Sequence, residues 1–283
     1  MIAVVGVGAI GAVTAAALEL AGHDLVLCAR RERRLTVRLD DGSRHRLRSP
    51  WVTDPDQVGP VDLVVLAVKA HQTGAAVPWL RRLRSERTPV LVLQNGVEHA
   101  ERLAGAVPAE CVVPGIVWCT AEEIAGEVLV RPGEQAIEVP AGDALGGVCD
   151  GSFLRIRPVE DFTTAAWRKL VFNAVVAVEA LTGRRAEVFH EPEVRSLARD
   201  LAVECVEVAT AAGARLPAGF ADHVVEVLLS LPPENGTSIL YDRCAGRELE
   251  WDARNGVISR VGAAHGIPTP ISDVLVPLLA AAR

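Results

Sequence analysis

The sequence predicts an N-terminal α/β domain built on a parallel sheet, followed by an all-α domain, and three observations support this. Its 283 residues correspond to about two domains of roughly 150 residues each. Short, continuous apolar runs in the first half are typical of parallel strands that are covered on both faces. From about Thr163 onward the apolar residues recur with helical period. We therefore place the boundary near Arg157–Phe162 and predict domains at residues 1–160 and 161–283.

The composition is that of a globular protein. Hydrophobic residues make up 50% and charged residues 23% of the chain, which excludes a disordered or collagen-like protein. The net charge of −7 argues against general binding to nucleic acid or to acidic membranes. We expect no signal peptide, because no charged leader or apolar h-region precedes the first apolar run. The apolar stretches are interrupted before they reach about 18 residues, so we expect no membrane span. The six cysteines are scattered without a Cys-x-x-Cys pair, so we expect reduced thiols, a cytoplasmic location and no metal site.

The elements of the first domain are predicted in order along the chain. Strands are expected at Ile2–Val5, Asp24–Ala29, Leu63–Val68, Pro89–Leu93 and Cys111–Val117. The first helix runs from Ile10 to Leu20 and stops at Gly22, a residue suited to ending a helix. In Val128–Val139, two alternating runs flank Pro132-Gly133, which predicts a β-hairpin.

Only helices are predicted for the second domain, because its apolar residues follow the helical period throughout. They are expected at Ala166–Leu181, Glu193–Ala212, Phe220–Leu229 and Ser238–Ala264, with a last helix introduced by Pro268 and Pro270 and ending at the C-terminus.

A glycine loop lies directly between the first strand and the first helix. Gly6 permits the tight turn, Gly8 lets the backbone approach a pyrophosphate, and Gly11 lets the helix pack on the strand. The pyrophosphate then meets the helix N-terminus at Ala9 and Ile10. This placement predicts a Rossmann-type dinucleotide site, and the alternative is a glycine-rich turn without a ligand.

The end of the second strand favours NADPH as the cofactor. An NAD site commonly has a carboxylate here that accepts from the ribose hydroxyl, whereas this chain has Arg30, followed by Arg31, Arg33 and Arg34. A guanidinium suits a 2′-phosphate through charge-assisted hydrogen bonds. We expect at least Arg33 or Arg34 to belong to a solvated face instead.

Polar residues follow two further strands. Lys69, His71 and Gln72 come after Leu63–Val68, and Asn95 comes after the next strand. Ligands of open α/β sheets bind at the carboxyl ends of the strands, so Lys69, Gln72 and Asn95 are predicted cofactor contacts. For Lys69 the alternative is a charge at the domain rim whose stem lies on apolar surface.

Together these motifs resemble the ketopantoate reductase family, and the resemblance covers essentially the whole chain in the right order. The matching motifs are Gly6-x-Gly8-x-x-Gly11, Ala67-Val68-Lys69-x-x-Gln72, Leu93-Gln94-Asn95-Gly96, Trp167-Arg168-Lys169-x-x-x-Asn173, Glu234-Asn235-Gly236-Thr237-Ser238 and His265-Gly266-Ile267-Pro268-Thr269-Pro270. The resemblance implies NADPH-dependent reduction of a small 2-oxo acid to a 2-hydroxy acid, as when ketopantoate is converted to pantoate in pantothenate biosynthesis.

The resemblance makes Lys169 the expected general acid. Lys169 and Asn173 are four apart, so on a helix they lie on one face. An ammonium near a ketone polarises the C=O bond and delivers a proton to its oxygen, while Asn173 binds the substrate. Without the resemblance, an exposed helix lysine and a surface amide would be the preferred interpretation.

The other implied substrate contacts come from a later segment. Ser238 is expected to bind the substrate carboxylate, helped by Asn235 and by Asn95. Glu250 is expected to accept from a substrate hydroxyl or to orient the reacting groups. Ser238 and Glu250 are twelve apart, which on one continuous helix places them roughly on one side. For Glu250 the alternative is an ordinary acidic helix face.

Three departures from the family pattern affect the predicted substrate. The segment Val175–Leu181 has neither the second asparagine nor the proline of the family, and it is one residue shorter. Arg184–Glu187 lacks an asparagine often found there, and Tyr241 stands where the family often has glutamine. These changes favour a 2-oxo acid in general over ketopantoate in particular.

Two other functions remain as alternatives. A 3-hydroxyacid dehydrogenase also pairs a Rossmann-type domain with a helical domain, but the Ser238 segment and the His265–Pro270 ending argue against it. A non-catalytic NADP(H)-binding regulator is disfavoured because Lys169 and Glu250 are present. The predicted partner is a small-molecule substrate, with no nucleic acid and no membrane. The sequence leaves open whether the chain forms a homodimer.

Overall fold

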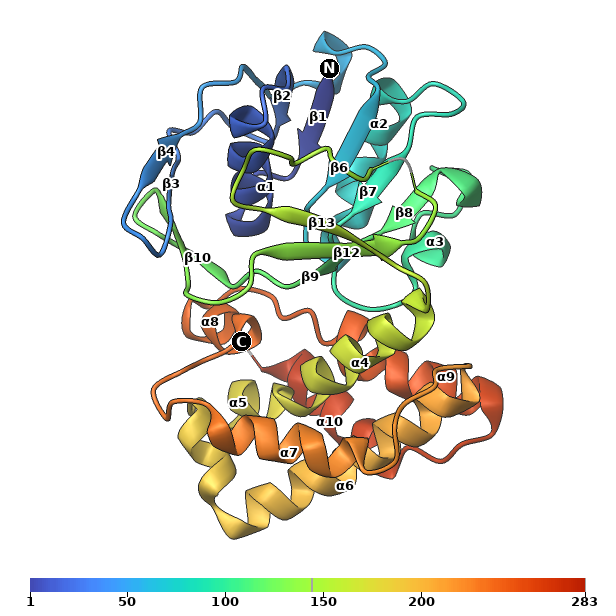
Figure 1. Ribbon diagram of the computed structural model, residues 1–283. Helices are drawn as coiled ribbons and strands as arrows, with labels where there is room; N and C mark the ends of the chain where they lie inside the picture. Colours follow the sequence, from blue (N-terminus) through green and yellow to red (C-terminus); the bar gives the residue numbers. More distant parts are fainter. Residues whose placement is uncertain (144, 283) are drawn as a thin grey trace. The chain divides into compact units, whose positions relative to one another are not determined.

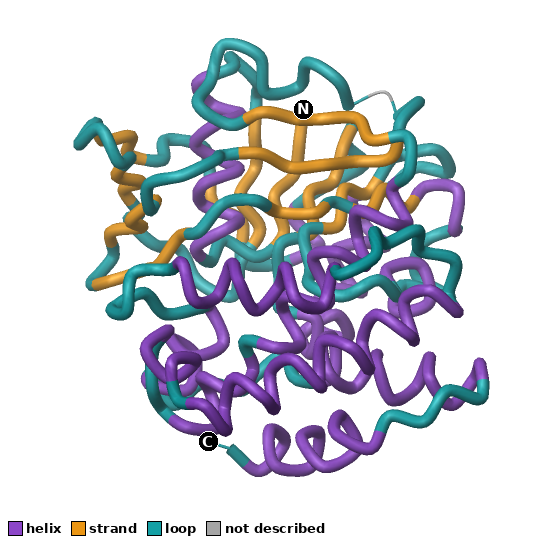
Figure 2. The backbone as a smooth tube through the Cα atoms, turned by 60° about the horizontal axis from the view of Figure 1, so that its bottom comes forward, coloured by secondary structure: helices purple, strands orange, loops and turns teal. Residues whose placement is uncertain are grey.

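The computed structural model describes residues 1–143 and 145–282, and the chain divides into two compact units (Figure 1). The first comprises Met1–Gln94 and Glu98–Phe162, and the second comprises Asn95–Val97 and Thr163–Arg283. All strands of the described residues belong to the first unit, and the described regular structure of the second is helical (Figure 2). The predicted fold class, a parallel sheet followed by helices, is confirmed.

A six-stranded parallel sheet forms the centre of the first unit, in the order β5-β2-β1-β6-β7-β8. Its strands are β1 (Ile2–Val5), β2 (Leu25–Cys28), β5 (Trp51–Val52), β6 (Leu63–Leu66), β7 (Val90–Val92) and β8 (Val112–Pro114). From β1 the chain adds β2 and β5 on one side and then β6, β7 and β8 on the other. The order therefore reverses between β1 and β6, which is where open α/β sheets bind their ligands.

Both faces of this sheet are buried, which explains its continuous apolar strands. Ile2 and Val4 pack in a cluster with α1 (Ala9–Leu20), whereas Ala3 and Val5 pack in a second cluster with α2 (Thr73–Leu83). Successive side chains of a strand point to opposite faces, so α1 and α2 cover different faces of the sheet. A strand in this position has no polar face, and the continuous apolar pattern follows.

Two smaller sheets complete the first unit, with orders β10-β11-β3-β4 and β13-β12-β9. Their strands are β3 (Thr36–Arg38), β4 (Arg44–Arg46), β9 (Ile116–Val117), β10 (Ala121–Ile124), β11 (Glu127–Val130), β12 (Ala136–Pro140) and β13 (Arg155–Val159). A short helix α3 (His99–Arg102) also belongs to this unit.

The predicted hairpin over Val128–Val139 is wrong, because its two runs join different sheets. β11 pairs antiparallel with β10, and β12 pairs with β9 and β13. The hairpin turn is Ala125-Gly126, with φ of 52° and 86°. Positive φ at both central residues gives a tight hairpin turn, but alanine rarely adopts it, so the turn had no clear sequence signal.

The predicted strand Cys111–Val117 is also divided. β8 belongs to the parallel sheet, and β9 belongs to the three-stranded sheet. The chain changes sheets at Gly115, where a β-carbon would come within 2.8 Å of the Leu93 side chain. A larger residue at this position would have to displace the Leu93 side chain, so close packing favours glycine.

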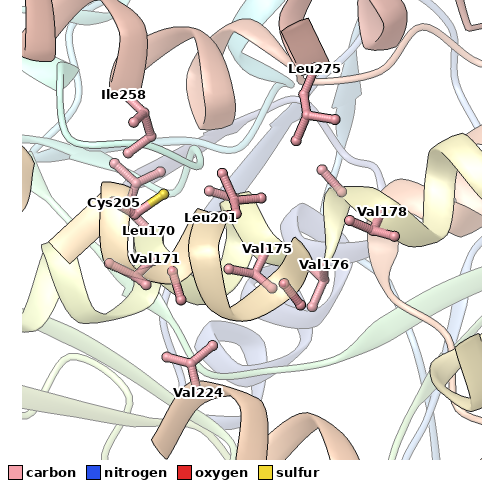
Figure 3. Close-up of a cluster of buried hydrophobic side chains, with 14 of the residues drawn as sticks. Leu170, Val171, Val175, Val176, Val178, Leu201, Cys205, Val224, Ile258 and Leu275 are labelled. Carbon is pink, nitrogen blue, oxygen red and sulfur yellow. The ribbon is translucent and has the colours of Figure 1, made fainter. Parts of the chain in front are cut away.

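Seven α-helices of the described residues form the second unit. They are α4 (Phe162–Val175), α5 (Ala177–Thr182), α6 (Pro192–Ala211), α7 (Phe220–Ser230), α8 (Ser238–Cys244), α9 (Val257–His265) and α10 (Pro270–Ala281). Leu170 of α4 and Leu201 of α6 belong to the buried core, together with Val224, Ile258 and Leu275 from three further helices (Figure 3). The predictions for α6, α7 and α10 are confirmed to within two residues.

Two predicted helices are interrupted. The helix expected over Ala166–Leu181 is broken at Val176 into α4 and α5. The long helix expected over Ser238–Ala264 is wrong: α8 ends at Cys244, Gly246 has φ of 62°, and regular structure resumes with a π-helix at Asp252–Gly256. A left-handed residue cannot continue a right-handed helix. Within the described residues, no helix is long and apolar enough to cross a membrane.

Candidate active site

The glycine loop between β1 and α1 is close-packed at two of its three glycines. Gly6 has φ of 91°, and a β-carbon there would lie 2.7 Å from the backbone nitrogen of Val68. A β-carbon at Gly11 would lie 2.0 Å from the carbonyl oxygen of Gly6. Both positions therefore require glycine for the fold itself, whatever the loop binds.

Gly8 differs from them because a β-carbon there would meet nothing within 4 Å. It is exposed and precedes α1, whose N-terminus has no side-chain cap and no acidic residue in its first turn. The amides of Ala9, Ile10 and Gly11 have no partner within the helix, because a helix leaves its first N–H groups unpaired. An open glycine beside free amides at a positive helix end fits a pyrophosphate.

The basic segment after β2 divides into exposed and paired arginines. Arg30 and Arg31 are exposed beyond the end of the strand, and so is Arg34. Arg33 donates to the Glu123 carboxylate of β10. The expected solvated face is therefore met by the exposed Arg34, whereas Arg33 is half-buried against Glu123. Arg30 is exposed at the position that suits a 2′-phosphate.

The polar residues after β6 start a helical turn. Lys69 precedes a 3-10 helix at Ala70–Gln72, and both Lys69 and Gln72 are half-buried. The buried Gln94 donates to the carbonyl of Val68 at 3.2 Å and to Thr73 Oγ1 at 2.9 Å. Gln94 thus ties the segment after β7 to the turn that carries Lys69 and Gln72.

Asn95 joins two predicted site residues in the helical unit, to which the segment Asn95–Val97 belongs. Asn173 Nδ2 donates to Asn95 Oδ1 at 3.2 Å, and Asn95 Nδ2 donates to Glu250 Oε2 at 3.0 Å. Glu250 is buried. An asparagine amide has two N–H groups and two lone pairs, so Asn95 still has one of each for a ligand.

Lys169 lies on α4, one turn before Asn173. Its side chain is half-buried, whereas the neighbouring Arg168 is exposed. The four-residue spacing within this helix gives the two side chains one face, as predicted. Lys169, Asn173, Asn95 and Glu250 all belong to the same compact unit.

Ser238 begins α8, and its hydroxyl is held by a buried arginine. Arg254 Nη2 donates to Ser238 Oγ at 2.8 Å. Arg254 is 2% exposed and belongs to the π-helix, whereas Ser238 is exposed. π-helical turns occur frequently at functional sites, and this one also places Asn255, whose Nδ2 donates to the carbonyl of Ala174 on α4.

A buried glutamate holds the start of α8. Glu179 Oε2 accepts from Thr237 N at 2.9 Å and from Thr237 Oγ1 at 2.7 Å. Desolvation by burial raises the pKa of Glu179, although these hydrogen bonds favour its ionised form. The exposed Asn235 lies two residues before Thr237, and its carbonyl accepts from the amide of Ala186.

Sequence reasoning missed Arg254 and Glu179. The signal available for Glu179 was an acidic residue inside an otherwise apolar run, at the place where the family pattern is interrupted. Arg254 gave no comparable signal, because an arginine in a charged segment is usually solvated. Among the described residues, no group of three histidine, cysteine, aspartate or glutamate side chains could hold a metal ion.

Family comparisons cover both units. Residues 2–144 match the model described as "Ketopantoate reductase PanE/ApbA", and residues 161–283 match its C-terminal counterpart. A 2-dehydropantoate 2-reductase of Mycobacterium tuberculosis (strain ATCC 25618 / H37Rv) is 49% identical over 287 residues, which cover 99% of this chain and 97% of the relative.

Solved structures show the same similarity. A 2-dehydropantoate 2-reductase of Geobacter metallireducens superposes with a TM-score of 0.91 at 26% identity, covering 100% of this chain and 99% of the other. A ketopantoate reductase of Staphylococcus aureus described as dimeric has a TM-score of 0.89 at 25% identity, covering 99% and 97%.

Proposed function

Because the chain belongs to the ketopantoate reductase family, we propose that it reduces ketopantoate to pantoate with NADPH, an oxidoreductase reaction of pantothenate biosynthesis. The observation that carries this proposal is the hydrogen-bonded chain Asn173–Asn95–Glu250 in the unit that also contains Lys169. Family membership favours this activity over a 3-hydroxyacid dehydrogenase. It also favours ketopantoate over other 2-oxo acids as the substrate, although the segment Val175–Leu181, which contains Glu179, departs from the family pattern.

Residues 1–160, which contain most of the first unit, are the proposed dinucleotide-binding domain. The amides of Ala9, Ile10 and Gly11 receive the pyrophosphate beside Gly8, which leaves open space for its approach. Arg30 meets the 2′-phosphate, which is the group that separates NADPH from NADH.

The remaining proposed cofactor contacts are Gly6, Lys69, Gln72 and Asn95. Gly6 shapes the turn of the loop, and Lys69 and Gln72 follow the strand beside β1. When bound, NADPH supplies a hydride to the carbonyl carbon of the substrate.

Residues 161–283, which contain most of the helical unit, are the proposed substrate and catalytic domain. As hydride reaches carbon, the C=O π bond breaks toward oxygen, and the Lys169 ammonium delivers a proton there. The products are the 2-hydroxy acid and NADP⁺. Asn173 donates a hydrogen bond to the substrate. Glu250 accepts a hydrogen bond from a substrate hydroxyl, and Asn95 holds the Glu250 carboxylate in place.

The substrate carboxylate is assigned to the start of α8. Ser238 is exposed there, and its oxygen already accepts from Arg254, so its own O–H group points to a different partner. Asn235 is exposed in the preceding loop and supplies a second donor. A hydroxyl and an amide are the groups expected to bind a carboxylate without competing charge.

Assembly and location are proposed on separate grounds. A homodimer is proposed because a similar ketopantoate reductase is described as dimeric; light scattering on the purified chain tests it.

The proposed location is the cytoplasm. All six cysteines are free thiols, and burial raises the pKa of Cys28 and Cys149 to about 12. Free thiols fit a reducing cytoplasm.

Cofactor oxidation tests the activity directly. Purified protein is incubated with NADPH and ketopantoate, other 2-oxo acids, 3-oxo acids or no substrate, and absorbance at the nicotinamide band is followed. The proposal expects the highest kcat/KM with ketopantoate. Preference for a 3-oxo acid would indicate the 3-hydroxyacid reaction, and NADPH binding without turnover on any acid would indicate a regulator.

A further inference from the structure

Arg254 is the least satisfied buried charge among the described residues. It is 2% exposed, and its hydrogen bond to Ser238 Oγ at 2.8 Å is made by Nη2 alone. Its Nε and Nη1 groups are buried and have no hydrogen-bond partner in the described part of the chain. A buried N–H group without a partner is costly, and each instance in a native protein requires an explanation.

Attraction to nearby carboxylates does not fully explain why Arg254 is buried with unpaired N–H groups. Glu250, Asp242 and Glu179 all favour its charged form, against a desolvation that lowers the pKa of Arg254. Each of these carboxylates, however, accepts hydrogen bonds from another residue. The donors are Asn95 for Glu250, Arg247 for Asp242 and Thr237 for Glu179.

The single hydrogen bond of Arg254 has a directional consequence for Ser238. Because the guanidinium has no lone pair, it can only donate, so Ser238 Oγ must accept from it. The Ser238 proton is then directed away from Arg254 and is available to an acceptor at the exposed start of α8. The positive charge lies directly behind that hydroxyl and favours an anionic acceptor.

We infer that Arg254 is a positioning residue that holds Ser238 as a hydrogen-bond donor and makes its site selective for the carboxylate of the oxo-acid substrate. This inference rests on the proposed function. It deepens that function by naming a residue that acts on the substrate through Ser238. Glu179 holds Thr237, which directly precedes Ser238. Glu179 and Arg254, which the sequence did not predict as site residues, therefore both bind the start of α8.

A double-mutant cycle tests the inference. The variants are Ser238→Ala, Arg254→Lys and their combination, with Arg260→Met as a control, because Arg260 is an exposed arginine of α9 that bonds Asp252. Arg254→Lys keeps the charge but loses the forked geometry that reaches Ser238. The readouts are KM for ketopantoate, kcat, the dissociation constant for NADPH and the melting temperature.

The expected result is a change in KM that depends on Ser238. Arg254→Lys should raise KM for ketopantoate by about 10- to 100-fold, the range of a charge-assisted hydrogen bond, while kcat changes less than about threefold. In the Ser238→Ala background the same substitution should change KM by less than about twofold. NADPH affinity should stay unchanged in all variants, and Arg260→Met should match the wild type.

Other outcomes overturn the inference. If the two substitutions raise KM independently, Arg254 does not act through Ser238. If Arg254→Lys lowers the melting temperature and leaves KM unchanged, the arginine is structural. Should Arg254→Lys not fold, Arg254→Gln, which keeps an N–H donor without charge, replaces it in the same cycle. Absence of turnover in the wild type would overturn the proposed activity and this inference with it, whereas independent effects overturn the inference alone.

Discussion

Gly11→Ala and Gly8→Ala form a matched pair that separates the structural requirement for glycine from the cofactor requirement. A β-carbon at Gly11 would lie 2.0 Å from the Gly6 carbonyl oxygen and 3.3 Å from Ala67 Cβ. Contacts of real β-carbons are at least about 3.0 Å, so the oxygen must retreat by about 1 Å. It belongs to the backbone of a tight turn, and a rotamer change cannot relieve the clash.

The magnitude follows from this geometry. Overpacking typically costs about 1–3 kcal/mol, and a rigid backbone partner places Gly11→Ala near the upper end. For a unit of this size, about 3 kcal/mol lowers the melting temperature by roughly 6–12 °C. Gly8→Ala meets nothing in the protein within 4 Å and loses only the N-cap preference for glycine over alanine, so it should melt within about 4 °C of the wild type.

The assay is thermal unfolding by circular dichroism without and with NADPH. A ligand that binds only the folded state raises the melting temperature in proportion to RT ln(1 + [L]/Kd). Gly8→Ala should lose most of this increment, because its new methyl group occupies the space through which the pyrophosphate approaches. A Gly11→Ala protein with wild-type melting behaviour would refute the packing argument, and a Gly8→Ala protein with the full NADPH increment would refute the proposed pyrophosphate position.

Substitutions at three further positions test the site. Lys169→Ala should lower kcat by about 10²- to 10⁴-fold with little change in NADPH affinity, and Lys169→Arg should not restore it fully; wild-type turnover would remove Lys169 from catalysis. Arg30→Ala should weaken NADPH binding by about 10- to 100-fold while NADH binding changes little, and equal losses in a fluorescence titration would contradict the 2′-phosphate assignment. Burial raises the pKa of Glu179 above 4.5, so its contribution to the free energy of unfolding falls as pH rises from that value through the raised pKa. Glu179→Gln does not titrate and should gain stability relative to the wild type as the pH rises above 4.5; a difference independent of pH in urea denaturation would contradict this.

Features that depend on neighbouring residues were predictable from the sequence. The glycine loop was predictable because strand, turn and helix are contiguous, and Gly6 and Gly11 have a steric reason that involves the same short segment or the strand beside it. Lys169 and Asn173 were placed on one face because the helical period alone determines that relation. Arg30 followed from its distance along the chain to the end of β2.

Features that depend on residues distant in the chain were decided by the tertiary structure. The hairpin expected over Val128–Val139 was wrong because alternation shows that a run has one buried face but not which strand it joins. The helix expected over Ser238–Ala264 was wrong because Gly246 adopts a left-handed conformation that the helical period does not reveal.

The cluster around Ser238 shows the same limit most clearly. Glu179, Ser238 and Arg254 come from α5, α8 and the π-helix, and separately each resembles an ordinary polar residue. Burying a charge is unfavourable unless partners arrive with it, and those partners are known only once the helices pack. The sequence by itself therefore determined the local chemistry of the loop and of α4, whereas packing decided which charges are buried and which hydroxyl they hold.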